Sequence, residues 1–195
     1  MAMPKQVLAL IFDGHTEWEF EFVVFCLTLA GCEVTVIAPD EKPVVGAFHQ
    51  RFGLSKVGAR PLSEINPASY DALFIPGAGE KAKAAMLDPN VQKLIQWFNQ
   101  KKRLIAAICG GPRFLDVAGI LEGRRWTSID QERRRIEDGE PPGPAVVVDS
   151  NLITASDRGF VEFTVCLLEA LGYAEVAQEL QNRYGKGKHD HDVTI

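Results

Sequence analysis

The residue whose type and surroundings point most directly to chemistry is Cys109. An apolar stretch at 104–108 leads into it, and Gly110, Gly111 and Pro112 follow. A buried strand, a cysteine, two glycines and a proline that can open a helix are typical of a sharp strand-to-helix turn with a thiol at its tip. The positive end of a helix dipole favours the thiolate, which attacks carbonyl carbon and reacts with peroxide. We therefore expect Cys109 to be the functional centre and to ionise near neutral pH.

The alternative is a buried structural thiol, since cysteine is among the most often buried residue types. The two glycines favour the reactive reading because they permit a close backbone approach and leave the Gly110 N–H free. A second glycine turn, Pro-Gly-Ala-Gly at 76–79, follows another apolar stretch. We expect the Ala78 and Gly110 N–H groups to hold a developing oxyanion, with Gly77 and Gly111 in support. An ordinary strand-to-helix turn is the alternative at 76–79.

Three acids, Glu17, Glu19 and Glu21, alternate with aromatic residues at the start of an expected helix over 16–30. Carboxylates in a first helical turn commonly just complement the helix dipole, and that reading accounts for at least one of them. A carboxyl group beside a thiolate would instead keep its proton and donate a hydrogen bond to sulfur, because two close negative charges are costly. We assign that role to Glu19.

Histidine, the usual base for a catalytic cysteine, is scarce here. Of the four in the chain, His15 and His49 fall in expected loops, and His15 is placed to reach the site. The other two, His189 and His191, belong to a polar segment at 186–195 that we expect to be a mobile tail. No metal is assigned to this segment.

Apolar strands alternate with helical patterns along the chain, which predicts an α/β fold with a mostly parallel sheet covered on both faces. Ligands of such sheets bind beyond the carboxyl ends of the strands, so the loops at 13–19, 76–79 and 109–112 should meet. The expected elements are strands at 7–12, 34–38, 71–75 and 104–108, helices at 16–30, 89–101 and 159–171, a β-like segment at 44–60 and a hairpin at 146–154.

The highly charged segment at 130–144, which includes the arginines at 133–135, predicts a solvated loop near the mouth of the site. Residues 1–185 are expected to form one domain, and the helix over 159–171 to be its last.

Composition limits the classes of function. The chain has 195 residues, of which 46% are hydrophobic, and a formal net charge of −5, so we expect no nucleic-acid surface. Neither a membrane-spanning stretch nor a signal peptide is recognisable, which predicts a cytoplasmic protein without membrane contact. The four cysteines are widely spaced, which suggests neither a zinc site nor a disulfide framework. No cofactor is indicated.

The chain resembles the ThiJ/PfpI superfamily, a class I glutamine-amidotransferase-like group that includes the parkinsonism-associated protein deglycase and the PfpI intracellular proteases. The resemblance covers residues 7–171. Its carriers are Asp-Gly at 13–14 with Glu19, the turn at 76–79 in place of Pro-Gly-Gly, the motif Ala-Ala-Ile-Cys-Gly-Gly-Pro at 106–112, and Val-Glu-Phe at 161–163.

This resemblance implies a flavodoxin-like three-layer α/β sandwich and a homodimer. It makes Cys109 the nucleophile at an elbow, Glu19 its protonated neighbour, and Ala78 and Gly110 the backbone donors. The family's activities include glyoxalase and deglycase chemistry on aldehydes, peptide hydrolysis, isonitrile hydration, and redox sensing or chaperoning through the cysteine.

The sequence departs from the family where its histidines stand. Gly110 replaces the histidine that directly follows the cysteine in PfpI-type members, and Ile129 stands where deglycase-like members carry one. Protease activity is therefore not expected. His15, Asp130 or a residue of a partner subunit would have to act as the base.

Two functions remain in competition. The first is a thiolate-dependent hydrolase or lyase on small electrophiles, with Cys109 attacking and Glu19 moving a proton. The second is a non-enzymatic sensor or chaperone of oxidative stress, in which peroxide oxidises Cys109. A scaffold that has lost its chemistry is a third reading.

Overall fold

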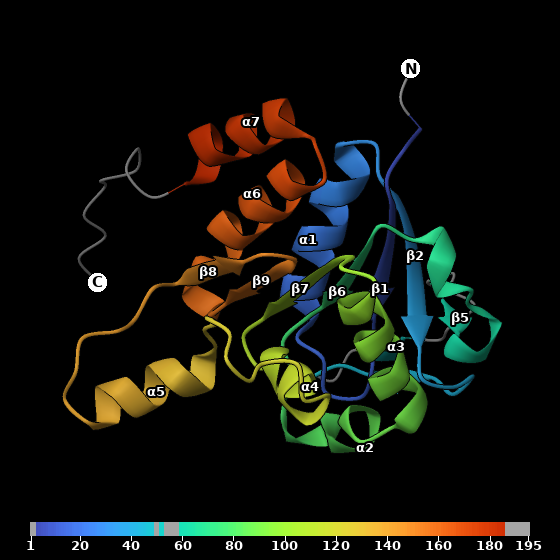
Figure 1. Cartoon of the computed structure of the whole chain (residues 1–195), viewed down its shortest axis with the longest axis horizontal. Coiled ribbons are helices and arrows are strands. Elements are labelled where there is room, and N and C mark those ends of the chain that lie inside the picture. Colours follow the sequence, from blue (N-terminus) through green and yellow to red (C-terminus); the bar gives the residue numbers. More distant parts are fainter. Residues whose placement is uncertain (1–2, 49–50, 53–58, 186–195) are drawn as a thin grey trace.

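The computed structural model describes residues 3–48, 51–52 and 59–185. At its centre lies a sheet in the order β5-β2-β1-β6-β7-β9-β8 (Figure 1), whose neighbouring strands run parallel except for the β9-β8 pair. A separate antiparallel pair, β3-β4, lies outside it. The strands are β1 (Gln6–Leu10), β2 (Glu33–Ala38), β3 (Val44–Val45), β4 (Arg51–Phe52), β5 (Arg60–Pro61), β6 (Ala72–Ile75), β7 (Leu104–Ile108), β8 (Val146–Asp149) and β9 (Leu152–Ala155).

Helices cover both faces of the sheet, which explains why its central strands are continuously apolar. One face packs against α1 and α6, with α7 lying on α6, and the other against α2, α3 and α4. The helices are α1 (Glu17–Leu29), α2 (Lys83–Met86), α3 (Pro89–Gln100), α4 (Pro112–Val117), α5 (Ile129–Glu137), α6 (Phe160–Ala170) and α7 (Ala174–Tyr184), with short 3-10 turns at Leu62–Glu64, Pro67–Ser69, Glu80–Ala82 and Asp157–Gly159.

The strand register brings the functional loops to one edge. Ile75 of β6 pairs with Ala107 of β7, and Ile108 of β7 pairs with Ala155 of β9. Because these strands are parallel, the segments that follow them leave the sheet side by side. The expected meeting of the loops after β1, β6 and β7 is therefore confirmed, and the loop after β9 joins them.

Two expectations about helices were wrong. The segment at 130–144 is not a loop throughout, because α5 occupies Ile129–Glu137 and carries the arginines at 133–135. Its start is capped by Ser128, whose Oγ accepts the Gln131 N–H at 3.2 Å. The helix over 159–171 is also not the last one, since α7 follows it.

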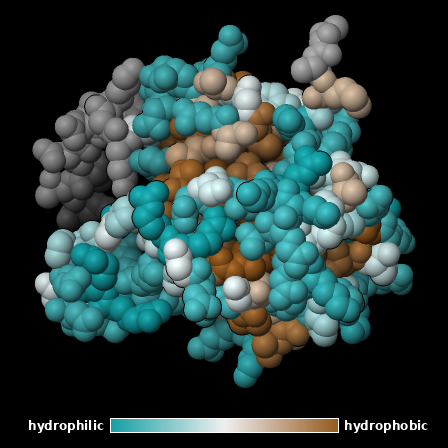
Figure 2. Space-filling model, viewed as in Figure 1, coloured by the Kyte–Doolittle hydropathy of each residue, from teal (hydrophilic) through white to brown (hydrophobic). Residues whose placement is uncertain are grey.

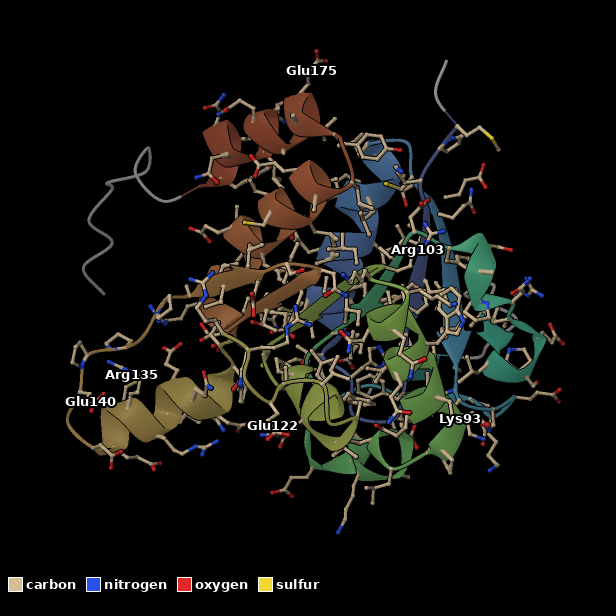
Figure 3. The ribbon with its side chains drawn as sticks, viewed as in Figure 1. Lys93, Arg103, Glu122, Arg135, Glu140 and Glu175 are labelled. Carbon is tan, nitrogen blue, oxygen red and sulfur yellow. The ribbon has the colours of Figure 1, made fainter. Side chains whose placement is uncertain are left out.

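Helix α5 stands at a corner of the molecule, outside the two helical layers (Figure 1). Figure 3 shows Arg135 and Glu140 at its outer end, where the two side chains form an ion pair of 3.1 Å. One of its residues, Glu132, is buried. The helix therefore depends on polar contacts more than on apolar packing.

No helix in the described ranges is long and apolar enough to cross a membrane. His49 and the predicted tail at 186–195, with its two histidines, lie outside the described residues.

Candidate functional site

Cys109 occupies the turn between β7 and α4 in a strained backbone conformation, with φ of 60°. Two hydrogen bonds hold the turn. The Cys109 N–H donates to the Ala155 carbonyl at 2.8 Å, and the Gly111 N–H donates to the Ile108 carbonyl at 2.7 Å. The side chain is partly exposed at the carboxyl edge of the sheet. The sequence prediction of a thiol at a sharp strand-to-helix turn agrees with this geometry.

Both glycines after Cys109 are required by space. A Cβ on Gly110 would lie 2.3 Å from the Ala78 carbonyl oxygen. A Cβ on Gly111 would lie 2.8 Å from the carbonyl oxygens of Ile108 and Ile75. The elbow thus packs directly against the backbone of the loop after β6.

Glu19 lies in the first turn of α1, where Thr16 and Glu19 have the spacing of a capping box. The side chain does not serve as a cap. Its Oε2 instead accepts the Gly77 N–H at 2.9 Å, and only 1% of the residue is exposed. Its carboxyl group lies beside the Cys109 thiol and the Thr16 side chain, and Oε1 has no hydrogen-bond partner among the described residues.

The other two acids near the start of α1, Glu17 and Glu21, have different surroundings. Glu17 is buried and both of its carboxylate oxygens accept the Phe48 N–H at 3.0 Å, which ties the loop before β4 to α1. Glu21 is exposed. The choice of Glu19 among the three agrees with this placement.

Glu19 and Cys109 form a coupled acid pair. Burial raises the pKa of Glu19 to about 7, against smaller opposing effects of its hydrogen bonds to Gly77 and Cys109. Burial also raises the pKa of the Cys109 thiol, and the negative charges of Glu19 and Asp157 raise it further. A hydrogen bond from the Gly110 N–H to the sulfur acts in the opposite direction. The pair therefore holds at least one proton around neutral pH.

The expected lowering of the Cys109 pKa by a helix dipole was wrong in direction. Helix α4 has only six residues, and the Gly111 N–H at its start points back to Ile108. The Gly110 N–H, expected to be free for an oxyanion, is directed at the sulfur. Desolvation raises the pKa of the Cys109 thiol by more than the Gly110 N–H lowers it.

Ala78 lies in the loop after β6, which two backbone hydrogen bonds join to the loop after β1. The Thr16 N–H donates to the Gly77 carbonyl at 2.8 Å, and the Gly79 N–H donates to the Gly14 carbonyl at 2.9 Å. These two bonds form an antiparallel bridge between His15 and Ala78 and fix the peptides on either side of Ala78. The N–H of Ala78 itself takes no part in the bridge. The backbone on both sides of Ala78 is thus fixed, and the role of Ala78 as an oxyanion donor stays a prediction.

Neither proposed base replaces the family histidine. His15 is fully buried, its Nδ1–H donates to the Phe12 carbonyl at 2.7 Å, and burial lowers its pKa. Asp130 is bound through both carboxylate oxygens to the guanidinium of Arg113, with both distances 2.7 Å. The ion pair lowers the pKa of Asp130, so it is a poor proton acceptor.

Sequence reasoning missed two charged residues of the site, Arg113 and Asp157. Asp157 is partly buried directly after β9, and its charge raises the pKa values of both Glu19 and Cys109. The sequence signalled only the hairpin at 146–154. The structure adds that the second strand of this hairpin extends the parallel sheet, which puts Asp157 at the functional edge. Within the described ranges, no cluster of three or more acidic, histidine or cysteine side chains is arranged to hold a metal.

Comparisons with known proteins place the chain. Its sequence matches the DJ-1/PfpI family over residues 5–170. Protein DJ-1 homolog D of Arabidopsis thaliana is 28% identical over 187 residues; the match covers 86% of this chain and 48% of the relative, so the chain spans about half of that relative's length. Deglycase PfpI of Pyrococcus furiosus is 34% identical over 125 residues, covering 63% of this chain and 73% of the relative.

Among solved structures, oxidized DJ-1 of Toxoplasma gondii superposes with a TM-score of 0.77 at 22% identity, covering 91% of this chain and 96% of that one. The predicted α/β sandwich with a mostly parallel sheet is thereby confirmed. The sequence match extends over most of the chain and includes every loop that surrounds Cys109. This chain belongs to the DJ-1/PfpI family.

Proposed function

We propose that this protein is a cysteine-dependent enzyme that acts on small reactive carbonyl compounds, as a deglycase or glyoxalase does. The observation that carries the proposal is the buried Glu19 carboxyl group beside the Cys109 thiol at a strained turn. Relatives from Pyrococcus furiosus and Thermococcus kodakarensis are named deglycases. Family membership and this acid pair together support a thiol that exchanges its proton with a carboxyl group.

The chemistry balances without an oxidant or cofactor. Glu19 takes the thiol proton, and the sulfur of Cys109 adds to the aldehyde carbon of a dicarbonyl such as methylglyoxal. The carbonyl π electrons move to oxygen, which the Ala78 N–H would stabilise and which regains the proton from Glu19. Transfer of a proton from that carbon to the neighbouring carbonyl oxygen gives an enediol. The proton of the former aldehyde hydroxyl then moves to the adjacent carbon, which gives a thioester of a hydroxy acid. Water then cleaves the thioester and restores the thiol, so dicarbonyl plus water becomes hydroxy acid.

A second function is favoured by a specific observation. The Glu19 carboxyl group, with a pKa raised to about 7, can donate a hydrogen bond to an oxidised sulfur. Peroxide would convert the thiol to a sulfenic acid and release water, and a second peroxide would give the sulfinic acid. On this reading the protein is a sensor or chaperone of oxidative stress. Proteolysis is not assigned, because Gly110 and Ile129 stand at the positions of the family's histidines.

Homodimer formation and a cytoplasmic location are part of the proposal. Figure 2 shows hydrophobic surface over the region where α1, α6 and α7 come together. A groove of about 400 Å³ there is lined by Phe25, Leu29 and Tyr184, all strongly exposed. A second copy would cover such apolar surface. No contact with nucleic acid or membrane is proposed.

The test is consumption of methylglyoxal by the purified protein. A Cys109→Ser variant should lose the activity, whereas Cys166→Ser, which changes another half-buried thiol, should retain it. Glu19→Gln should lower turnover because it removes the proton acceptor. Unchanged consumption by the Cys109→Ser variant would refute the enzymatic proposal.

The sensor is tested by intact mass after mild peroxide treatment, followed by peptide mapping. Added oxygen should map to Cys109, which is partly exposed, whereas Cys26 is buried in the apolar core and should stay unmodified. Equal oxidation of all four cysteines would contradict this function.

A further inference from the structure

Arg113 ties together the segments that surround Cys109. Its Nε and Nη2 donate to the two carboxylate oxygens of Asp130 at 2.7 Å each, and its Nη1 donates to the Ala78 carbonyl at 3.1 Å. Three of the five guanidinium N–H groups are thus engaged. The side chain is 33% exposed, so one edge of it remains open toward solvent and the site.

This placement brings a positive charge close to the sulfur. Arg113 follows Cys109 by four residues in the first turn of α4. The Ala78 oxygen that it binds is so close to Gly110 that a Cβ there would lie 2.3 Å away. The hydrogen bond to Asp130 contributes most to raising the pKa of Arg113, and a thiolate at Cys109 raises it further. Because the Coulomb interaction between two groups is mutual, the guanidinium favours the thiolate equally.

The other charged groups around the sulfur act against the thiolate. Glu19 reaches it from α1 and Asp157 from the turn after β9, and both carry negative charge when ionised. On the side of Arg113, Asp130 and the exposed Glu80 are also acidic. Among the described residues, Arg113 is therefore the cation that interacts with Cys109. Its effective charge depends on how far Asp130 neutralises it.

We propose that Arg113 is the positioning residue that stabilises the Cys109 thiolate in place of the family's histidine, and that Asp130 limits its strength. The proposal rests on the proposed function in one respect, that Cys109 reacts as a thiolate. It assigns the Arg113–Asp130 pair an electrostatic role in addition to holding α5 against α4.

A purely structural role makes a different prediction. Either substitution disrupts the Arg113–Asp130 pair, and Arg113→Gln also removes the bond to the Ala78 carbonyl. A structural role of the pair therefore moves the reactivity of Cys109 in the same direction in both variants. The electrostatic role moves it in opposite directions. Loss of Arg113 removes a cation and raises the pKa of the thiol, whereas neutralising Asp130 exposes that cation and lowers it.

The experiment measures the rate at which iodoacetamide alkylates Cys109 as a function of pH, followed by peptide mass. Arg113→Gln should move the profile up by about one pH unit or more, and Asp130→Asn should move it down. Arg113→Lys keeps the charge and should stay closer to the unmodified protein than Arg113→Gln. Circular dichroism confirms that each variant is folded. If Arg113→Gln does not fold, the downward shift expected for Asp130→Asn, which keeps the cation, tests the proposal.

The matched control is the ion pair between Arg103 and Asp71, at 3.3 Å. These residues lie at the amino ends of β6 and β7, away from the functional edge, and Figure 3 shows Arg103 remote from α4 and α5. Arg103→Gln and Asp71→Asn should leave the profile unchanged.

Shifts in the same direction for Arg113→Gln and Asp130→Asn, or none in either, would overturn the proposal. Such a result combined with Cys109-dependent methylglyoxal consumption would leave the proposed function standing. Opposite shifts without any consumption would support the electrostatic role of Arg113 and refute the enzymatic function.

Discussion

Gly77 and Glu19 fit together so closely that a Cβ on residue 77 would lie 2.1 Å from Glu19 Oε2. The same contact supplies the hydrogen bond, since the Gly77 N–H donates to that oxygen at 2.9 Å. Glycine at this position therefore allows a buried carboxyl group to reach past the loop after β6. The position of the carboxyl group beside Cys109 depends on the absence of a side chain on a different loop.

Gly77→Ala should displace Glu19 and destabilise the protein. Overpacking of a buried site costs about 1–3 kcal/mol, and the displaced carboxyl group would also lose its amide partner. Urea denaturation measures the free energy of unfolding. Gly79→Ala in the same turn is the control, because its Cβ would meet the nearest atom, the Gly14 carbonyl oxygen, at 3.4 Å. Equal losses in the two variants would contradict the close fit.

The raised pKa of Glu19 predicts how stability changes with pH. The folded state binds the proton with a pKa of about 7 against an ordinary value of 4.5, so the group's stabilising contribution is complete below about pH 4.5. It is lost as the pH rises through about 7, and a shift of this size corresponds to about 3 kcal/mol.

Glu19→Gln carries no such charge and should remove this part of the pH dependence. The measurement is the difference in unfolding free energy between the protein and the variant across that pH range. Glu21→Gln, at an exposed position of the same helix, should leave the dependence intact. A difference that stays constant with pH would show that the Glu19 carboxyl group is not held protonated.

The sequence allowed prediction of the parallel sheet and of the loops that meet at its edge, because apolar strands and glycine turns are local signals. Cys109, Glu19 and Ala78 were selected in this way, and their roles stay predictions. The electrostatic balance could not be found, because it depends on burial and on partners distant in sequence. The ion pair of Arg113 with Asp130 joins residues on two helices, and α5 was hidden by its charged composition.

Asp157 was missed for a topological reason. A hairpin over 146–154 is readable from its turn residues, but its position in the sheet is not. Only the parallel pairing of Ile108 with Ala155 brings the end of β9 beside the elbow. Turn residues therefore predict where the strands lie in the sequence. They do not predict which strand ends lie together at one edge of the sheet.

Gly111→Ala should be among the most damaging substitutions in the turn. Its Cβ would lie 2.8 Å from three backbone carbonyl oxygens, those of Ile108, Ile75 and Pro76. Backbone atoms of two central strands cannot yield as a flexible side chain can, so we expect a loss above about 3 kcal/mol. Gly143→Ala, whose nearest neighbour is a side-chain carbon of Arg135 at 3.5 Å, should be close to neutral in thermal denaturation. A small effect at Gly111 would mean that the elbow adapts.

Asp157→Asn should make Cys109 more reactive, although it adds no positive charge. The carboxylate of Asp157 raises the pKa values of both Glu19 and the Cys109 thiol, so its neutralisation should lower both. Alkylation of Cys109 by iodoacetamide, followed by peptide mass, should then extend to lower pH than in the unmodified protein.

Glu162→Gln separates this local effect from a general loss of negative charge. Glu162 lies in the first turn of α6, and its charge acts on Cys166. Its neutralisation should shift the alkylation of Cys166 and leave that of Cys109 in place. If both variants changed Cys109 equally, the long-range field of the acidic chain would control the thiol, and Asp157 would have no special place beside the elbow.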